Sequence, residues 1–328
     1  MSTIVITGIR SRLAQLVAGV LQAQADVRII GVDREPPTIP LDIEFRSLEL
    51  RGTRILDLLQ ETGAQTVIHL AQLGEEQALV GREVAVSGNV MTTIELLGAC
   101  VTAKVRRVVL RDSTFVYGAT FDQPMFLNEA APLQITGRLS PFKDYVEIAR
   151  FVADFSTKHP DISIITLRCA GLVGQGVSSP LMRYLNQPNP RVMFGFDPII
   201  QVLHHDDAAI AFALAALTPE DCGVIHIAAD MPVTLAHAIR MTGQQPIPLL
   251  SPAFDAARVL GGTISFAVGT LPFDPLFLRY PCTVDTSKAR SVLNFTPQYD
   301  SYTALRELAS VGTTTEQAYK EKPLTTSG

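Results

Sequence analysis

Apolar residues along the first two-thirds of the chain follow two alternating patterns. Short runs rich in β-branched residues are typical of buried strands, and longer stretches with apolar residues every three or four positions are typical of helices. The expected strands lie at 3–7, 27–32, 43–45, 66–70, 107–110 and 163–167. The helical patterns lie at 13–21, 53–61, 85–102 and 142–158. Strands that alternate with helices predict parallel pairing through right-handed crossovers, so we expect an α/β fold with a Rossmann-type, doubly wound parallel sheet.

This regular alternation ends after the sixth expected strand. Loop-like stretches rich in Gly, Ser, Pro or Asn lie at 171–180, 186–190, 246–252 and 272–281. Two more strands are expected at 201–205 and 224–228, with an alanine-rich helix between them. We therefore expect a nucleotide-binding Rossmann domain over residues 1–170, to which 201–228 return. A small C-terminal lobe, formed mainly by 171–328, is expected to bind the substrate.

The composition narrows the class of protein. Of the 328 residues 47% are hydrophobic, which is enough for a large core, and a net charge of −5 without a basic cluster argues against nucleic acid as a partner. The four cysteines form no C-x-x-C pair, so we expect reduced thiols in a cytoplasmic protein. The most membrane-like stretch, 259–273, is shorter than the roughly 20 residues of a spanning helix. Glycines and a proline also interrupt it, so we expect no membrane span.

Three strand ends predict a dinucleotide site. The first strand ends in Thr7-Gly8, and the turn that follows opens a helix whose N-terminus can bind a pyrophosphate. Asp33 ends the second strand, where its carboxylate can accept hydrogen bonds from ribose hydroxyls. His69-Leu70-Ala71 ends a strand at the same sheet edge. The expected cofactor-binding residues are Gly8, Arg10, Ser11, Arg12, Leu13, Asp33, Arg34, Glu49, Leu50, Leu70, Ala71, Gln72 and Cys169.

The turn keeps one of the three glycines of the usual dinucleotide fingerprint. Gly8 remains, whereas serine and alanine stand at the other two positions. The side chain of Ser11 obstructs the approach of the backbone to a phosphate, but its hydroxyl can bond a phosphate oxygen itself. The alternative is a turn that keeps the shape without a cofactor, and the position of Asp33 favours binding. Asp33 also favours NAD, whereas Arg10 and Arg34 can hold the 2′-phosphate of NADP; both cofactors stay open, with NAD preferred.

Motifs along most of the chain support a family resemblance. They are Val67-Ile68-His69-Leu70-Ala71, Asn89-Val90, Glu95-Leu96-Leu97-Gly98-Ala99, Ser113-Thr114-Phe115-Val116-Tyr117-Gly118, Leu167-Arg168, Gly171-Leu172-Val173-Gly174, Val284-Asp285-Thr286-Ser287-Lys288-Ala289-Arg290 and Leu293-Asn294-Phe295-Thr296-Pro297. In this order the chain resembles the extended short-chain dehydrogenase/reductases, the NAD-dependent epimerase/dehydratase family, and within it an atypical UDP-glucose-4-epimerase-like group. The resemblance implies NAD or NADP as cofactor and a small-molecule substrate such as a nucleotide sugar. It also implies a homodimer formed through the helices near 85–102 and 142–158.

The resemblance further implies a catalytic serine, tyrosine and lysine. Ser113 occupies the serine position, but Phe142 stands at the tyrosine position and Val146 at the lysine position. A phenol with a pKa near 10 needs a nearby cation to act as a base at neutral pH, and neither replacement can move a proton. The usual transfer of a hydride together with a proton is therefore unsupported.

Neighbouring side chains offer partial substitutes for the missing pair. Tyr145 lies on nearly the same helical face as Phe142, and Lys143 can approach the ribose if the helix begins late or the alignment slips by one residue. The candidate catalytic residues are therefore Ser113, Lys143 and Tyr145, with Asp112 nearby. The alternative, which the sequence favours, is that Tyr145 packs in a dimer interface and Lys143 is solvated.

Two further groups of residues are candidates for ligand binding. Arg191 and Arg279 lie in the expected lobe and can clamp a phosphate, so with Asp112 and Ser113 they are the expected substrate-binding residues. His204-His205-Asp206-Asp207 suggests a metal site. However, histidines that end a strand should point to opposite faces, and aspartates suit a helix N-terminus, so we expect no metal.

Three functions stay open on this basis. The first is an NAD(P)-binding epimerase/dehydratase-like protein that acts on a nucleotide-sugar-like substrate by a non-standard mechanism. The second is a non-catalytic nucleotide sensor or scaffold, which the residues Phe142 and Val146 favour. The third is activity on a lipid-like substrate, which rests only on the apolar stretch 259–278.

Overall fold

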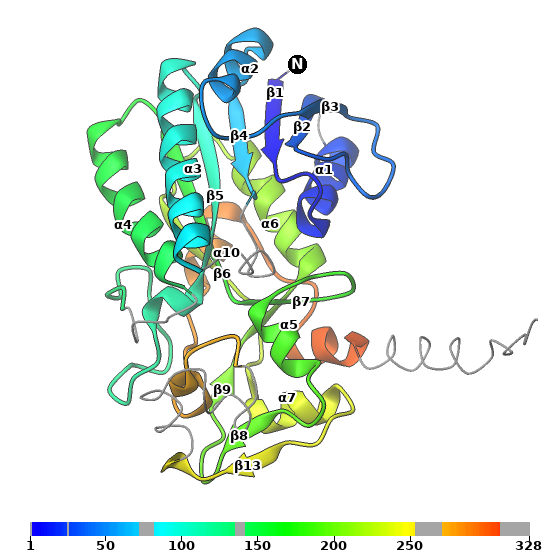
Figure 1. Ribbon diagram of the computed structural model, residues 1–328, viewed down its shortest axis with the longest axis vertical. Coiled ribbons are helices and arrows are strands. Elements are labelled where there is room, and N and C mark those ends of the chain that lie inside the picture. The colour runs from blue at the N-terminus through cyan, green and yellow to red at the C-terminus, as the bar shows by residue number, and fades with distance from the viewer. Residues whose placement is uncertain (1, 25, 72–81, 135–141, 253–270, 309–328) are drawn as a thin grey trace, which may run out of the picture.

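The computed structural model describes residues 2–24, 26–71, 82–134, 142–252 and 271–308 (Figure 1). Two sequence-based expectations lie outside these residues. They concern Gln72 and most of the apolar stretch 259–273.

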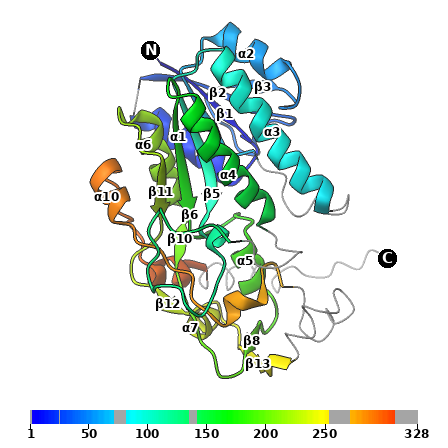
Figure 2. The same cartoon turned by 90° about the vertical axis from the view of Figure 1, so that its left-hand side faces the viewer.

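Seven parallel strands form the central sheet, in the order β11-β6-β5-β4-β1-β2-β3 (Figures 1 and 2). They are β1 (Ser2–Thr7), β2 (Val27–Asp33), β3 (Glu44–Ser47), β4 (Thr66–His69), β5 (Arg107–Ser113), β6 (Ser163–Cys169) and β11 (Val224–Ile227). The strand order changes direction between β1 and β4. Ligands of open α/β sheets bind at such a switch point, outside the carboxyl ends of the strands. The expected doubly wound fold is confirmed.

Helices cover both faces of the sheet (Figure 2). On one face α1 (Arg12–Gln24) packs beside α6 (His205–Leu217), whose alanines let it lie close to the strands. On the other face lie α2 (Arg54–Thr62), α3 (Arg82–Thr102) and α4 (Lys143–Lys158). The inner strands β1, β4, β5 and β6 are therefore buried on both sides, which explains their apolar runs, whereas the edge strand β3 is polar and partly exposed. No described helix is both long and apolar enough to cross a membrane.

A smaller lobe with its own apolar core lies below the carboxyl edge of the sheet (Figure 1). Three two-stranded pairs support it: β7 (Gly171–Val173) with β10 (Val202–His204), β8 (Arg191–Met193) with β13 (Ile247–Leu249), and β9 (Ile199–Ile200) with β12 (Val233–Thr234). Its helical segments are α5 (Pro180–Leu185), α7 (Leu235–Met241) and η4 (Pro275–Leu278). After the lobe, α10 (Ser287–Leu293) packs against β11 and α6.

The lobe differs from the sequence-based expectation in three places. The expected loop at 171–180 contains β7, and the proline-rich stretch at 246–252 contains β13. The expected strand at 201–205 ends at His204, and His205 is the first residue of α6. In each case a pairing partner distant in the sequence decides the outcome, and local composition carries no information about that partner.

Candidate functional site

The turn after β1 holds Gly8 against the end of β4. Gly8 has a φ of +74°, and a Cβ at this position would lie 2.6 Å from the backbone nitrogen of Ala71. The Leu70 amide donates to the carbonyl of Thr7 over 3.3 Å, which holds the two strand ends together. A side chain at Gly8 is therefore excluded both by backbone conformation and by space.

Ser11 caps the helix that follows this turn. Its hydroxyl donates to the Gly8 carbonyl (2.9 Å) and accepts from the Ala14 amide (3.3 Å). The hydroxyl proton thus has a partner within the turn, whereas the sequence had suggested a phosphate oxygen. The first amides of α1 have no acceptor within the helix, so they remain the natural donors to an anion.

The end of β2 carries a cluster of opposite charges. The Asp33 carboxylate accepts from the backbone amides of Arg10 (3.1 Å) and Arg34 (2.8 Å). The Arg10 guanidinium forms an ion pair with Glu35, and the Arg34 guanidinium lies 2.6 Å from the Glu49 carboxylate. Both predicted phosphate-binding arginines are therefore already next to carboxylates.

The other predicted cofactor residues lie around this edge of the sheet. Leu13 and Leu70 are buried in the core beneath the turn, and Leu50 packs half-buried against the core under α2. The Arg12 side chain approaches Gly176, in the loop after β7. Cys169 ends β6, and burial raises the pKa of its thiol to about 12.

The position that the sequence predicts for the family's catalytic tyrosine is apolar and filled. Phe142 is the N-cap residue of α4, and only 3% of its surface is exposed. Its ring stacks on that of Phe115 with the centroids 4.6 Å apart. Val146, one turn further on, is equally buried. Ser113 remains at the end of β5, where its hydroxyl accepts from the Phe115 amide over 3.3 Å.

The two predicted substitutes lie at different depths beside Phe142. The helix does begin late, at Lys143, but the Lys143 side chain is 49% exposed and its Nζ lies 3.6 Å from the Glu147 carboxylate. Tyr145 is half-buried, with its ring centroid 6.0 Å from that of Phe142, and packs between two apolar clusters. Lys143 therefore lies at the surface and Tyr145 between the clusters, and a catalytic role for either stays a prediction.

A cavity lies next to this position, between the sheet edge and the lobe. It encloses about 460 Å³, including the part open to solvent. Its described lining is Thr114, Phe115, Gly171, Leu181, Ile199, Ile200, Gln201, Leu235, Phe273, Phe277, Tyr280 and Cys282. Thr114 follows Ser113 directly and is one of the lining residues, so the cavity adjoins the place where the family's substrate is expected.

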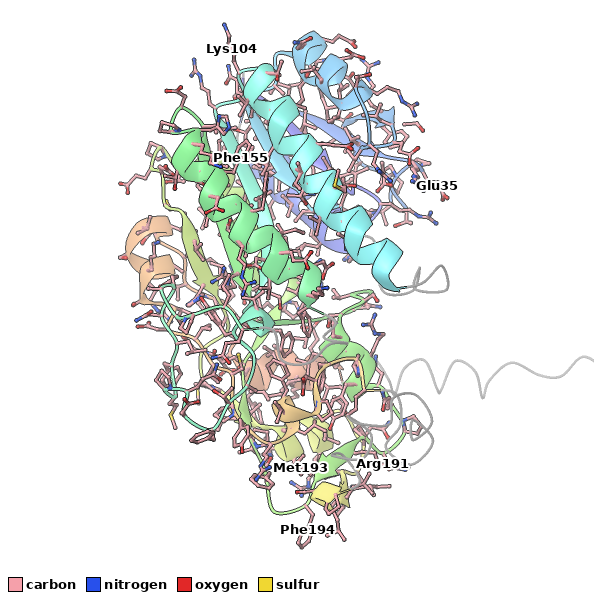
Figure 3. The ribbon with its side chains drawn as sticks, turned by 60° about the vertical axis from the view of Figure 1, so that its left-hand side comes forward. Glu35, Lys104, Phe155, Arg191, Met193 and Phe194 are labelled. Atoms are coloured by element: carbon pink, nitrogen blue, oxygen red, sulfur yellow. The ribbon has the colours of Figure 1, made fainter. Side chains whose placement is uncertain are left out.

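The two arginines predicted to clamp a phosphate are not among the lining residues. Arg191 lies at the tip of the lobe, away from the sheet, where its Nη1 donates to the Asn189 carbonyl over 3.0 Å (Figure 3). The Arg279 guanidinium stacks over the rings of Phe196 (4.6 Å) and Tyr280 (5.2 Å). The structure therefore does not bring the predicted substrate-binding residues together.

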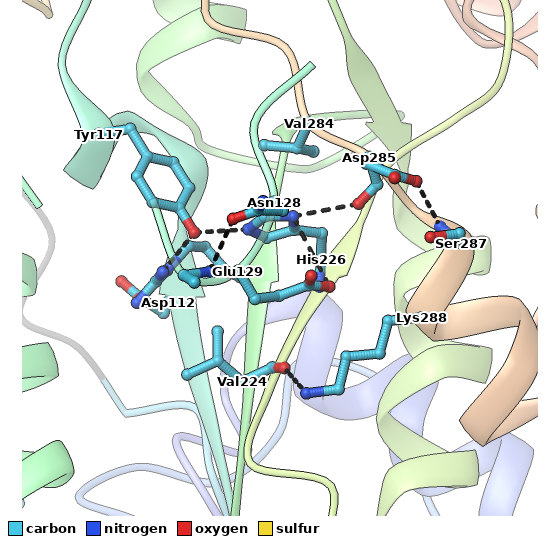
Figure 4. Close-up of polar contacts among 12 residues, drawn as sticks. Asp112, Tyr117, Asn128, Glu129, Val224, His226, Val284, Asp285, Ser287 and Lys288 are labelled. Carbon is cyan, nitrogen blue, oxygen red and sulfur yellow. Dashed lines mark hydrogen bonds and ion pairs between the residues drawn. The ribbon is translucent and has the colours of Figure 1, made fainter. Parts of the chain in front are cut away.

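A buried polar chain, which the sequence analysis did not identify, joins β5, β6 and β11 (Figure 4). Arg168 Nε donates to Asp112 Oδ2 (2.7 Å), and Arg168 Nη1 donates to the Tyr117 hydroxyl (2.5 Å). That hydroxyl lies 2.6 Å from His226 Nε2, and His226 Nδ1 lies 3.1 Å from the Asp285 carbonyl. The carbonyl can only accept, so Nδ1 carries the proton and Nε2 accepts from Tyr117.

The burial of this chain fixes its protonation. Desolvation raises the pKa of Tyr117 to about 12 and lowers that of His226 to about 4. Tyr117 is fully buried and its proton is committed to His226, so it cannot replace the missing catalytic tyrosine. A signal was present in the sequence, because Arg168 interrupts an apolar strand. A buried charge requires a partner, and Asp112 lies beside it in register.

The two adjacent histidines correct one expectation from the sequence. The rings of His204 and His205 lie 4.3 Å apart and not on opposite faces, because the chain turns from strand into helix between them. His204 Nδ1 accepts from the Asp206 amide over 3.3 Å and so caps α6. Possible ligand atoms of His204, His205 and Asp206 lie within 4.8 Å of one another. The absence of a metal here stays a prediction.

Comparisons with known proteins agree with this fold. The NAD dependent epimerase/dehydratase family matches residues 4–228. An uncharacterized protein of Mycobacterium tuberculosis, Rv0501, is 29% identical over 285 residues, which cover 84% of this chain and 75% of that protein. A 3-diazoavenalumate denitrifying reductase of a Streptomyces species is 30% identical over 182 residues, covering 52% of this chain and 57% of the reductase.

A solved structure shows the same fold over nearly the whole chain. MoeE5, in complex with UDP-glucuronic acid and NAD, superposes with a TM-score of 0.73 at 20% identity. The superposition covers 96% of this chain and all of MoeE5.

Proposed function

The chain belongs to the NAD-dependent epimerase/dehydratase family, and from this premise we propose that it binds NAD but lacks the family's tyrosine-assisted proton transfer. One observation carries the proposal: Phe142, at the tyrosine position, is buried and stacked on Phe115. Together with Val146 it puts apolar groups where a proton would have to move. The protein is then a nucleotide-binding protein without epimerase or dehydratase turnover.

The charges around Asp33 support NAD over NADP. Glu35 and Glu49 already neutralise Arg10 and Arg34. A 2′-phosphate would have to displace these carboxylates and would meet the charge of Asp33 as well. When bound, NAD would supply the hydride acceptor. Gly8, the first amides of α1 and Asp33 would hold its pyrophosphate and ribose.

Calorimetric titration of the intact protein tests this proposal. We expect one NAD per chain and at least tenfold weaker binding of NADP. Asp33→Asn should weaken NAD binding about tenfold or more, because hydrogen bonds to a charged group contribute ~1.5–3 kcal/mol. Asp42→Asn, in the loop before β3, is the matched control and should leave binding unchanged. Absence of NAD binding at millimolar cofactor would overturn the proposal.

A nucleotide sugar is the second ligand that family membership suggests. MoeE5, which holds UDP-glucuronic acid beside NAD, supports this choice. The lining of the cavity opposes it, since none of its described residues carries a charge to meet a diphosphate. Equilibrium dialysis with UDP-glucose, with and without NAD, tests whether a nucleotide sugar binds. Binding of UDP-glucose would support this ligand, and no binding in either condition would exclude it.

A second candidate function is reduction by hydride transfer alone. The Streptomyces relative is a denitrifying reductase, and the aromatic cavity suits an aromatic acceptor. A diazonium group with a phenolate on the same ring has no net charge. It can take a hydride from NADH and release N₂ to give the phenolate, while NADH becomes NAD⁺, so no side-chain acid is needed. The test follows the absorbance of NADH at 340 nm while the protein is incubated with NADH and the diazonium compound. NADH consumption faster than that with the Gly8→Ala variant would support this function, and an equal rate would exclude it.

We also propose a cytoplasmic homodimer that forms through α3 and α4. These helices pack side by side on one face of the sheet, and Asn89 Nδ2 donates to Asp144 Oδ2 over 2.7 Å between them. Met91 is exposed on the outer side of α3. The four free thiols suit a reducing compartment. Light scattering after gel filtration should give twice the chain mass, and Met91→Glu should shift it towards the monomer.

A further inference from the structure

The cavity beside Phe115 has the chemistry of a site for an uncharged ligand. Among its described lining residues there is no lysine, arginine, histidine, aspartate or glutamate. Placing a charged group in such surroundings is strongly unfavourable unless opposite charges or several hydrogen bonds meet it. A diphosphate therefore finds no charged partner on this lining.

The polar atoms of the lining are mostly engaged within the protein. Gln201 Nε2 donates to the Val284 carbonyl (3.2 Å), and Gln201 Oε1 accepts from the Val284 amide (2.7 Å). The Cys282 thiol donates to the Thr114 carbonyl over 3.4 Å, and burial raises its pKa to about 12, so no thiolate forms. The hydroxyls of Thr114 and Tyr280 can each give a ligand one directional hydrogen bond.

Three phenylalanine rings share what is left of the described lining with the aliphatic side chains of Leu181, Ile199, Ile200 and Leu235. The Phe115 ring stacks on Phe142, and the Phe277 ring meets it edge-on with the centroids 4.7 Å apart and an interplanar angle of 88°. Phe273 lies parallel to Phe115 at 6.0 Å. A planar ring among them can make both stacked and edge-to-face contacts, which are the two favoured aromatic geometries.

We propose that this cavity binds an uncharged, planar aromatic molecule and not a nucleotide-sugar diphosphate. The inference rests on the proposed function, in which NAD binds at the carboxyl edge of the sheet. It extends that function to the ligand that would bind beside NAD. Phe142 is not among the described lining residues, but its ring packs behind the Phe115 ring that lines the cavity. Because phenylalanine has no hydroxyl, position 142 brings no proton donor to this wall.

A fluorescence titration of the full chain tests the proposal. The probe is N-phenyl-1-naphthylamine, which is neutral and aromatic and becomes fluorescent in apolar surroundings. We expect saturable binding at one site, displacement by neutral coumarin and no displacement by millimolar UDP-glucose. Phe277→Leu keeps the wall apolar but removes one aromatic edge, so probe binding should weaken roughly three- to tenfold. Phe155→Leu, on α4 outside the cavity, is the matched control and should bind as the unmodified chain does.

Displacement of the probe by UDP-glucose would overturn the proposal. Equal weakening in the two variants would also do so, since the probe would then bind elsewhere. Calorimetry with NAD on the same samples keeps the two proposals separate. NAD binding without probe binding overturns only the aromatic ligand, whereas probe binding without NAD binding overturns only the proposed function. Circular dichroism melting shows whether Phe277→Leu is folded.

Discussion

Two regions at the carboxyl edge of the sheet differ in how many of the features expected for the family they retain. Around Gly8 and Asp33 the backbone has the close approach and the carboxylate that a dinucleotide needs. Around Phe142 stacked rings lie where the family resemblance predicts protic groups. The first region depends on backbone geometry and the second on side-chain chemistry, so they can change independently. On the proposed function, this difference separates cofactor binding from proton transfer.

The strongest way to break the comparison is to fill the space at Gly8. Gly8→Ala puts a Cβ 2.6 Å from the Ala71 nitrogen at a φ of +74°. The left-handed conformation alone costs about 1–2 kcal/mol, and the clash adds to it. We expect NAD binding to fall at least a hundredfold by calorimetry and the free energy of unfolding in urea to fall by several kcal/mol.

The matched control for that change is Gly19→Ala, in the middle of α1. No atom lies within 4 Å of the added Cβ, and the helical backbone accepts alanine. Stability should rise by up to about 1 kcal/mol with NAD binding unchanged. If Gly8→Ala behaved like Gly19→Ala, the turn would not be the dinucleotide site.

Acid should weaken the turn at Gly8 and the buried polar chain through Tyr117, since each contains a buried neutral histidine. Burial lowers the pKa of His69, which contacts Thr7 before the turn, to about 4, and that of His226 to about 4. A depressed pKa means that the unfolded chain binds the proton first. The contribution is therefore complete above about pH 6.5 and is lost as the pH falls towards 4.

Urea unfolding between pH 7 and pH 4 measures this loss, which should be about 2–3 kcal/mol for His226 alone. His226→Gln should flatten the pH dependence in that window, whatever its effect on stability at pH 7. His237→Gln, at an exposed position, is the control and should keep the slope of the unmodified chain. If the free energy of unfolding of His226→Gln depended on pH as steeply as that of the unmodified chain, His226 would not be a buried neutral histidine.

Placing a tyrosine at position 142 should destabilise the protein and should not create epimerase activity. Phe142→Tyr adds a hydroxyl to a side chain that is 3% exposed, among other rings. We expect a loss of about 1–2 kcal/mol of unfolding free energy, since a buried polar group without a partner is costly. Phe155→Tyr, half-buried on α4, should change stability by less than about 0.5 kcal/mol. A stable Phe142→Tyr variant with epimerase activity would show that the region is still built for proton transfer.

The smallest expected effect concerns Lys143. Its exposed ion pair with Glu147 spans one helical turn, and such pairs contribute about 0.3–0.5 kcal/mol. Lys143→Ala should change stability by no more than this and should leave NAD binding unchanged. A marked loss of NAD binding would instead make Lys143 a substitute for the missing lysine.

Much of the fold, but less of the site, follows from the sequence. Except for the edge strand β3, the strands from β1 to β6 have apolar runs, and the turn at Gly8 and the carboxylate at Asp33 are local signals. The contacts of Arg191 and Arg279 depend on how the lobe folds, and local sequence does not encode that. The pairing of Arg168 with Asp112 and His226 needs the register of three strands that are far apart in the chain. The cavity arises in the same way, because residues from 114 to 282 meet only in the folded protein.

The most direct test of the central claim is product analysis on NAD-saturated protein. The protein, with its bound NAD quantified by calorimetry, is incubated with UDP-glucose, and UDP-galactose is measured by liquid chromatography. We expect bound NAD and no UDP-galactose above the level in a protein-free control. Accumulation of UDP-galactose that requires both the protein and NAD would contradict the account.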